Sequence, residues 1–238
     1  MEFSEIVAPT VKELFIRRIE DSILSGELAI GEQLPSEREL AEQMHVSKTV
    51  VHAGITDMVR KGFLEVVPRK GVFVGDYANK GSLEALVSIM QHNGGQLDER
   101  NVRSLLEMRY AIESVCLLRI LDRKDPQVTA RLGEILRKAE QEAEAQSPNC
   151  VRLAEYYYTF HHTLCAASGN TIAPLIMNAF HVPAVRLWAN SARALGPADS
   201  VGRLHRFYTL ICQGEREKAL KYLHWMSYES EKIVRENG

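Results

Sequence analysis

A local surplus of positive charge in the first third of the chain has the chemistry needed to hold phosphate. Five Lys or Arg residues lie between positions 48 and 70, with only two acids among them. The first 75 residues as a whole carry nine basic and twelve acidic side chains, a balance of −3. Because a cation that neutralises a nucleic-acid phosphate releases condensed counterions, such a concentrated surplus indicates a surface for a polyanion. The five cations are Lys48, Arg60, Lys61, Arg69 and Lys70.

Two short helices are expected to position the first of these cations. The spacing of Ser36 and Glu39 predicts a capping box that opens one helix, and Ser47 is suited to cap a second helix that ends before Gly62. Two helices joined by so tight a turn have the helix-turn-helix form. The second helix of that motif enters the major groove by its N-terminal end. The side chains expected to face DNA are therefore Ser47, Lys48, Thr49 and His52.

A basic hairpin follows the second helix. Residues 63–67 and 71–74 alternate in the manner of two strands, and Pro68-Arg69-Lys70-Gly71 predicts the turn between them. This turn forms a wing whose two cations can lie beside phosphates or in the minor groove. Each charge taken singly is typical of an ordinary solvated surface. The order of capping box, turn, second helix and basic hairpin is what predicts a winged helix-turn-helix.

Composition limits the class of protein. Hydrophobic residues make up 45% and charged residues 25% of the 238 residues, and the net charge is −2, which is typical of a soluble globular protein. No apolar run is long enough to span a bilayer, and the N-terminus does not resemble a secretory signal. The four cysteines include no C-x-x-C pair and are interpreted as reduced thiols. We expect a cytoplasmic protein with no membrane partner.

The chain is expected to be mostly α, with two domains. Residues 1–75 form the winged helix-turn-helix, residues 76–81 a linker within the segment GDYANKGS, and residues 82–238 an all-α antiparallel bundle of about six or seven helices. Apolar residues three and four apart, with Gly, Pro and Asn at the breaks, set the helix bounds. The expected helices are 82–92, 98–123, 126–146, 150–168, 171–195, 198–213 and 215–236.

The first domain resembles a known family. The segments LPSERELAEQMHVSKTVV and MVRKGFLEVVPRKGVFV are similar to the DNA-binding module of the GntR family of transcription regulators. The resemblance implies contacts to double-stranded DNA from Arg38, Ser47, Lys48 and Thr49, with Arg69, Lys70 and Gly71 of the wing alongside. It also implies that the chain binds a short palindrome as a homodimer. His52 stands where the family usually has Arg, and a neutral imidazole cannot replace a bidentate guanidinium.

The second domain resembles the all-helical ligand-binding domain of the FadR subgroup, on the residues Leu106-Glu107-Met108-Arg109, Phe160-His161 and Ser168-Gly169-Asn170. This implies a small-molecule effector, which we expect to be an acyl-CoA, a fatty acid or another organic acid. Aromatic residues at helical spacing and single histidines are also common as packing or surface residues, and that alternative stays open. The candidate effector-binding residues are Arg109, Tyr157, His161, Arg186, His205, Trp225 and Tyr228.

Many members of the subgroup hold a divalent metal through one Asp and three His residues. Here only His161 matches, because Tyr157 and Leu204 stand at two other positions and Tyr228 at the last. His205, one residue from its expected place, is the second metal candidate. Three of the four usual ligand positions are unmatched, and a metal needs several converging ligands, so no cofactor is assigned.

The most consistent function is a ligand-responsive transcription regulator, here expected to repress. A metal-dependent enzyme is disfavoured, because the adjacent His161 and His162 point about 100° apart on a helix. The chain also lacks an H-E-x-x-H, a G-x-S-x-G and a P-loop. We therefore expect no enzyme. A structural module that has lost DNA binding stays open as an alternative, on the ground of His52 and Gly54.

Overall fold

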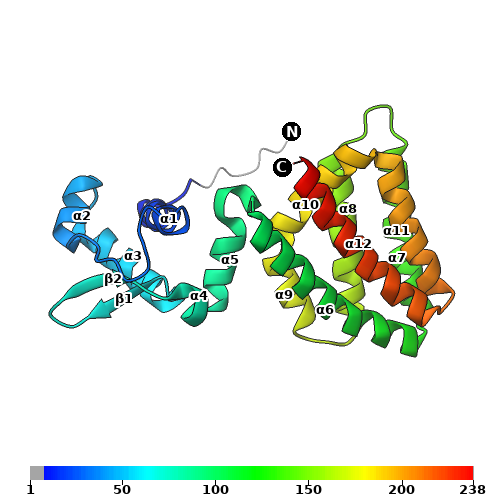
Figure 1. The fold of residues 1–238 in the computed structure, drawn as a ribbon, viewed down its shortest axis with the longest axis horizontal. Helices are drawn as coiled ribbons and strands as arrows, with labels where there is room; N and C mark the ends of the chain where they lie inside the picture. Colours follow the sequence, from blue (N-terminus) through cyan, green and yellow to red (C-terminus); the bar gives the residue numbers. More distant parts are fainter. Residues whose placement is uncertain (1–7, 238) are drawn as a thin grey trace. The chain divides into compact units, whose positions relative to one another are not determined.

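The computed structural model describes the backbone of residues 8–237 and the side chains of residues 8–227. The chain divides into two compact units, Met1–His92 and Asn93–Gly238 (Figure 1). Each unit has its own buried core. Within the part of the chain that the structure covers, no helix is long and apolar enough to cross a bilayer.

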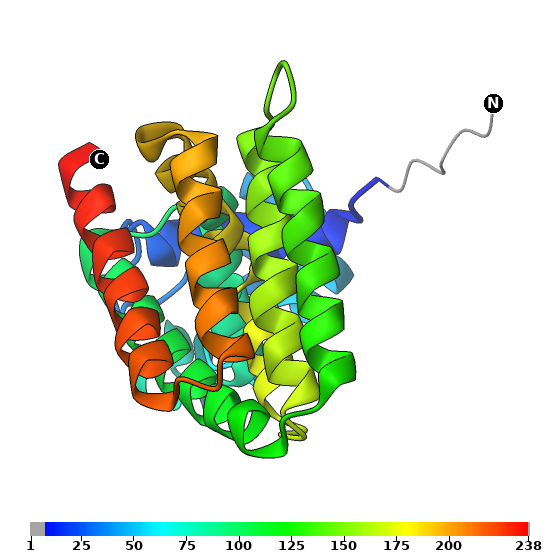
Figure 2. The same cartoon turned by 90° about the vertical axis from the view of Figure 1, so that its right-hand side faces the viewer.

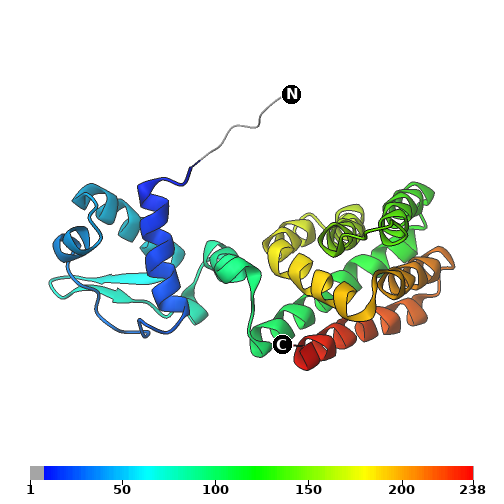
Figure 3. The same cartoon turned by 90° about the horizontal axis from the view of Figure 1, so that it is seen from above.

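The first unit is a winged helix-turn-helix. Strands β1 and β2 form an antiparallel hairpin in which Leu64 pairs with Val74 and Val67 with Gly71. Helix α1 packs on α3, and Figure 3 shows α1 from its side. Phe15, Met58 and Phe63 are among the side chains of the core. The elements are α1 (Val11–Leu24), α2 (Glu37–Gln43), α3 (Lys48–Lys61), β1 (Leu64–Val67), β2 (Gly71–Val74), α4 (Tyr77–Lys80) and α5 (Leu83–Gln91).

Local sequence signals set the helix ends as expected. Ser36 and Glu39 form the capping box of α2, and the Ser47 hydroxyl accepts a hydrogen bond from the Val50 amide at the start of α3. Gly62 ends α3 with a φ of 91°, in the left-handed region that favours glycine. The predicted caps of α2 and α3 and the predicted end of α3 are therefore confirmed.

Gly54 has a packing role in the first unit. A Cβ at this position would lie 2.4 Å from Cδ1 of Phe15 and 2.6 Å from its Cε1. The missing side chain thus lets the Phe15 ring of α1 sit against the backbone of α3. This close approach of two helices explains the glycine at position 54. Gly54 therefore gives no support to the alternative that the module has lost DNA binding.

The structure divides the chain later than the sequence predicted. Residues 77–80 of the expected linker form the short helix α4, and α5 belongs to the first unit. Ala85 of α5 is buried in the core of that unit, with Ile89 packed against it. The Ser82 amide also donates to the Lys61 carbonyl over 2.9 Å. Burial of this apolar face on α3 overrides the linker-like composition of residues 75–82.

The second unit is an all-helical bundle, as predicted. Helix α8 packs against α6, α7 and α10, and Figure 2 shows α12, α11, α8 and α7 side by side. A 3-10 turn, η1 (His92–Gly95), precedes the bundle. The elements are α6 (Glu99–Arg123), α7 (Pro126–Ala143), α8 (Cys150–Ala167), α9 (Ala173–Ala179), α10 (His181–Leu195), α11 (Pro197–Cys212) and α12 (Arg216–Asn237).

The single helix predicted over residues 171–195 is two helices, α9 and α10, which meet at Phe180. Pro183 lies in the first turn of α10 and has no amide hydrogen to donate to the carbonyl of Ala179. A proline is tolerated in a first turn and breaks a helix interior. The helix therefore ends and restarts ahead of Pro183.

Candidate nucleic-acid interface and effector cavity

The start of α3 presents a polar face to solvent. Lys48, Thr49 and His52 are exposed, while Val51 and Ile55 of the same helix are buried in the core. Helical periodicity separates the two faces, because residues three and four apart share a side. The buried face fixes the orientation of α3, and the exposed face is available to a partner. The structure thus places three predicted DNA-facing residues on one surface.

The wing is held in a defined conformation. Arg69 has a φ of 64° and Gly71 a φ of 124°, both left-handed, and the Gln33 side-chain amide donates to the Lys70 carbonyl over 2.7 Å. A Cβ on Gly71 would lie 2.8 Å from Nε2 of Gln33. Arg69 and Lys70 are exposed and make no ion pair with any residue whose side chain is described. The turn therefore presents two available cations.

Two of the five clustered cations have carboxylate partners inside the unit, one pair exposed and the other largely buried. Arg60 pairs with Glu84 of α5 over 2.5 Å. The Lys61 Nζ pairs with Oε1 of Glu20 over 2.8 Å, with side-chain exposures of only 18% and 12%. A charge already paired and largely desolvated is a poor phosphate ligand. Lys61 is therefore unavailable to a phosphate, whereas Arg60, 58% exposed, has only an exposed partner.

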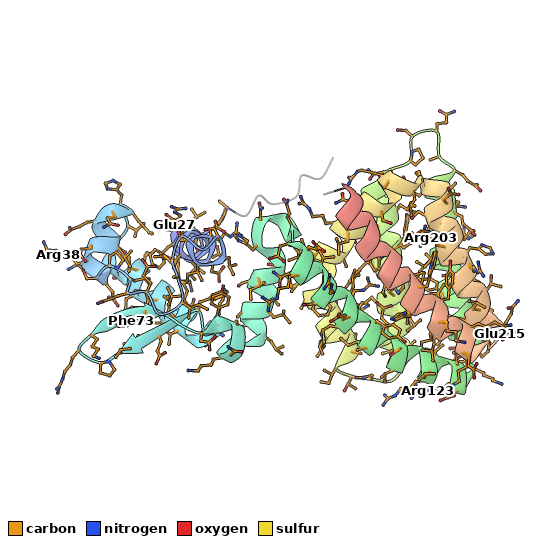
Figure 4. All side chains as sticks on the ribbon, viewed as in Figure 1. Glu27, Arg38, Phe73, Arg123, Arg203 and Glu215 are labelled. Atoms are coloured by element: carbon orange, nitrogen blue, oxygen red, sulfur yellow. The ribbon has the colours of Figure 1, made fainter. Side chains whose placement is uncertain are left out.

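Two other predicted DNA contacts carry exposed carboxylate partners. Arg38 of α2, labelled in Figure 4, pairs with Glu42 over 2.9 Å. Nδ1 of His52 lies 2.9 Å from Oε1 of Glu37. Exposed ion pairs contribute little to stability, so a phosphate can displace either carboxylate at small cost.

The second unit contains a buried chain of charged and polar groups. The Arg109 guanidinium donates to Oε1 of Glu113 from Nε over 3.0 Å and from Nη2 over 2.8 Å. Nδ1 of His161 donates to Oε2 of the same carboxylate over 2.6 Å. The Trp188 ring lies 4.3 Å from the guanidinium carbon of Arg109 and stacks on His161 at 5.1 Å. Helices α6, α8 and α10 thus converge on one polar cluster.

Glu113 is held ionised in this cluster. Burial alone would raise the pKa of its carboxyl group, but Arg109 and His161 outweigh that effect and lower the pKa to about 2. Such a pair is stable only while both partners remain, because either charge alone in the core is costly. Close by, burial raises the pKa of Tyr157, whose hydroxyl hydrogen-bonds with Ser200 Oγ over 2.9 Å.

A small cavity lies beside this cluster. Its volume is about 30 Å³, enough for roughly two water molecules. Arg203 of α11, labelled in Figure 4, is half-buried and makes no ion pair among the described side chains. Arg109 is already neutralised by Glu113, so Arg203 is the cation that can accept an anion here. The lining consists of Arg109, Tyr157, His161, Trp188, Ser191, Ser200, Arg203, Leu223, Met226 and Ser227.

Only part of the predicted effector set meets at the cavity. Arg109, Tyr157 and His161 line it, whereas Arg186 donates to Gly94 O and Gln96 Oε1 elsewhere on α10. The other two described candidates are also displaced. Nδ1 of His205 lies 2.7 Å from Oε1 of Glu140 at an exposed site. The Trp225 ring stacks on the Tyr222 ring, and the Arg203 guanidinium lies over the Trp225 ring. The side chain of Tyr228 lies outside the described residues.

The residues present do not fit a metal centre. His161 is buried and bonded to Glu113, while His205 is exposed and bonded to Glu140. Tyr157 and Leu204, at the two unmatched positions that the structure describes, offer a neutral phenol and a hydrocarbon. Among the residues that the structure describes, no three His, Cys, Asp or Glu side chains gather around one point. The expected metal candidates are thus separated into two different environments.

Sequence reasoning did not assign a role to several residues of the polar cluster and of the cavity beside it. Glu113 stands four residues after Arg109, a spacing that predicts an ion pair on one helix face, so this partner was detectable. Arg203, Trp188 and the cavity serines have no local signal, because α10, α11 and α12 bring them together only through packing.

Comparisons with known proteins agree with both units. Residues 13–74 match the family model of bacterial regulatory proteins of the GntR family, and residues 104–224 match that of the FCD domain. The regulator Mce2R of Mycobacterium tuberculosis is 26% identical over 226 residues, which cover 93% of this chain and 90% of that protein. The fatty acid metabolism regulator protein of Shewanella oneidensis is 29% identical over 159 residues, 67% of this chain and 62% of that protein.

Solved structures share the fold. Lar, which controls expression of the agr system of Listeria monocytogenes, superposes with a TM-score of 0.68 at 14% identity, covering 98% of this chain and 100% of that one. McbR/YncC of E. coli gives 0.51 at 17% identity, with 96% and 99% covered. The matched families are regulators and not enzymes. The chain belongs to the GntR family of bacterial regulatory proteins, in the group whose helical domain is an FCD domain.

Proposed function

We propose that this regulator binds a short palindromic operator as a homodimer and represses from it, and that a small organic acid in the helical unit changes its affinity for DNA. The exposed cations of α3 and the wing support the DNA contact, because they stand out from a segment that is otherwise anionic. Two recognition helices of a symmetric dimer would enter successive major grooves about 34 Å apart. The DNA contacts are Arg38, Ser47, Lys48, Thr49, His52, Arg69, Lys70 and Gly71.

The proposal that the effector is an organic acid rests on Arg203. It lines the cavity without a carboxylate partner among the described side chains, while Ser191, Ser200 and Ser227 surround the same space with hydroxyl groups. A guanidinium beside hydroxyl donors is suited to a carboxylate, which accepts charge-assisted hydrogen bonds. Because the cavity is only about 30 Å³, the effector is a small acid with few carbon atoms.

A long-chain acyl group is the second candidate, favoured by the name of the Shewanella relatives, fatty acid metabolism regulator protein. Pockets for drug-sized ligands span about 300–1,000 Å³, about ten times the present cavity or more. An acyl chain would therefore require α8, α10 or α12 to separate. Only the acyl chain requires these helices to move apart, so one experiment distinguishes a short acid from a long-chain acyl group.

The test is a titration of purified protein with short mono- and dicarboxylic acids and, separately, with palmitoyl-CoA. Binding is followed by tryptophan fluorescence and by release of a labelled duplex that carries the promoter region beside its own gene. We expect a short acid to release the duplex and the variant Arg203→Gln to lose that response. Arg206→Gln is the matched control, since Arg206 lies one turn away over Tyr222 and does not line the cavity.

Release by palmitoyl-CoA alone, or a response to short acids that survives Arg203→Gln, would overturn the proposed effector class. Deletion of the gene should raise transcription from the same promoter. A fall in transcription would show activation and contradict the proposed repression.

A further inference from the structure

Helix α10 carries two arginines that are bonded only to uncharged groups. Arg186 donates from Nη1 to the Gly94 carbonyl over 3.3 Å and from Nη2 to Oε1 of Gln96 over 3.2 Å. Arg193 donates from Nη1 to Oδ1 of Asn190 over 2.8 Å. Neither arginine forms an ion pair with any side chain that the structure describes. Because a guanidinium has five N–H donors, each arginine keeps a positive charge and donors for a further acceptor.

The two arginines lie on one side of α10. They are seven residues apart, close to two helical turns, so they project from the same face about 10 Å apart along the helix axis. Both are exposed. Arg193 reaches back to Asn190, and Arg186 reaches back to the turn whose Gly95 lies against Val182. Both side chains thus lean toward the N-terminal end of the helix, and their charged ends keep the spacing of the backbone.

A groove with an apolar wall runs beside these arginines. Its volume is about 430 Å³, compared with about 30 Å³ for the cavity at Arg203. Val182, Val185 and Ala189 of α10 line it together with Val151 of α8, which is 46% exposed. There is no Asp or Glu among the described residues of its lining. The groove is within the size range of ligand sites, about 300–1,000 Å³, and it is both apolar and cationic.

This arrangement favours a ligand with an anionic group at each end and hydrocarbon between them. A carboxylate accepts charge-assisted hydrogen bonds from a guanidinium, and here two guanidinium groups are available. A methylene chain lying between them would cover the valine side chains and remove apolar surface from water. An acid with one carboxylate leaves one arginine unused, and a short diacid cannot reach both.

We propose that this groove is a second ligand site, which binds a linear dicarboxylate of medium chain length with one carboxylate on Arg186, the other on Arg193 and the methylene chain against Val151 and Val182. The groove shares no described lining residue with the cavity at Arg203. The inference therefore goes beyond the proposed function and does not depend on DNA binding.

The test is isothermal titration calorimetry of the full-length protein with octanedioate and decanedioate. Octanoate has a single carboxylate, and butanedioate is too short to reach both arginines. We expect the better of the two long diacids to bind once per chain, and octanoate to bind at least about tenfold more weakly, because it loses one set of charge-assisted hydrogen bonds. Every titration is repeated in Arg203→Gln, so that the cavity does not contribute. The long diacid should bind that variant as it binds the wild type.

Three variants alter the groove itself. Arg186→Gln and Arg193→Gln should each weaken binding of the long diacid by about tenfold or more and remove its advantage over octanoate. Val151→Asp keeps both arginines but places a carboxylate in the apolar wall, so it should also weaken binding. Arg186 additionally holds the turn at residues 93–96. If Arg186→Gln fails to fold, the other two variants decide the question.

Arg152→Gln is the matched control. Arg152 follows Val151 on α8, is exposed, pairs with Glu142 and does not line the groove. The substitution removes the same charge as the groove variants do, so a general loss of attraction for anions would appear here too. We expect binding within about twofold of the wild type. Circular dichroism melting verifies that every variant is folded.

Three results would overturn the second site. The first is that neither long diacid binds the wild type. The second is that Arg193→Gln and Val151→Asp bind the long diacid as the control does. The third is binding that is lost in Arg203→Gln and kept in Arg193→Gln, which would assign the diacid to the cavity.

Sedimentation of the same variants tests the other occupant of such a surface, a second copy of this chain. If Val151→Asp dissociates a dimer and the wild type binds no diacid, the groove is an interface between copies and the proposal is wrong. None of these measurements involves a duplex. Failure of the second site is therefore distinguishable from failure of the proposed function.

Discussion

The two units of this regulator use charge in opposite ways. In the first, Lys48 and the wing cations stand in solvent without partners among the described side chains. In the second, Arg109 and Glu113 are 5% and 1% exposed and neutralise each other. Exposed cations contribute affinity for an external polyanion and little to stability, whereas a buried pair must remain intact for the fold to persist.

This difference separates two kinds of substitution. Changes to the exposed cations should alter DNA binding while leaving the stability of the protein nearly unchanged. Changes to the buried cluster should act on folding first, and through it on the effector response. The comparison would fail if an exposed cation proved essential for stability, or if the buried arginine could be removed without cost.

The largest effect is expected for Arg109→Ala. Removing the guanidinium leaves the Glu113 carboxylate buried without its main partner, which costs about 3–5 kcal/mol in unfolding free energy. Urea denaturation followed by tryptophan fluorescence measures the second unit. Arg119→Ala, an exposed position on the same helix, should change the value by less than about 0.5 kcal/mol. Equal unfolding free energies for the two variants would contradict a stabilising role of the buried ion pair.

The stability of the second unit should depend on pH through the Glu113 carboxyl group. Its pKa is lowered from 4.5 to about 2 in the folded protein. A group whose pKa is lowered by folding contributes stability above its unfolded value and loses it as the pH falls toward its folded value. As the pH falls from about 4.5 to about 2, the free energy of unfolding of the second unit should therefore decrease by a few kcal/mol.

Glu113→Gln tests that assignment, because it cannot titrate there. The groups that face Glu113 are Arg109 on α6 and His161 on α8, and both are kept in the variant. Denaturation curves at several pH values should show a flatter profile than the wild type. A profile as steep as that of the wild type would place the acid sensitivity on other carboxylates.

A smaller effect is expected from the close approach of α1 and α3. Gly54→Ala places a methyl group within 2.4 Å of the Phe15 ring, and overpacking of this kind costs about 1–3 kcal/mol. Gly202→Ala is the matched control, because no atom lies within 4 Å of its added Cβ in α11, and alanine favours a helix by about 0.5–1 kcal/mol. The melting temperature should therefore fall in Gly54→Ala and rise in Gly202→Ala. A stabilising Gly54→Ala would refute the packing role.

The sequence predicted the first unit in detail because its signals are local. The Ser36 capping box, the Ser47 cap and the Gly62 stop each depend on residues within four positions, and all are present. The ion pairs of Arg60 and Lys61, which the sequence shows only as members of the basic cluster, have a non-local origin. Their partners Glu84 and Glu20 lie 24 and 41 residues away, and only the packing of α5 and α1 on α3 brings them close.

The effector cavity was predictable only in part for the same reason. Arg109, Tyr157 and His161 lie on helix faces that the sequence pattern orients toward the core. Arg203 comes from α11, some forty residues beyond His161, and no spacing rule links the two. Arg186 was expected at the cavity but holds the turn at residues 93–96 instead, because α10 presents Arg186 and Trp188 to different surroundings.

The salt dependence of duplex binding tests the central claim most directly, that exposed cations contact phosphate and the cation of a buried ion pair does not. Binding of the promoter duplex is measured by anisotropy across a range of salt concentrations for the wild type, for Lys48→Ala, and for Lys61→Met combined with Glu20→Gln, which leaves no charge of that pair behind. The slope of log K against log salt should fall in magnitude by about one in Lys48→Ala, and it should stay at the wild-type value in the double variant, because Lys61 is only 18% exposed and paired with Glu20. An unchanged slope in Lys48→Ala, or an equal fall in the double variant, would contradict the account.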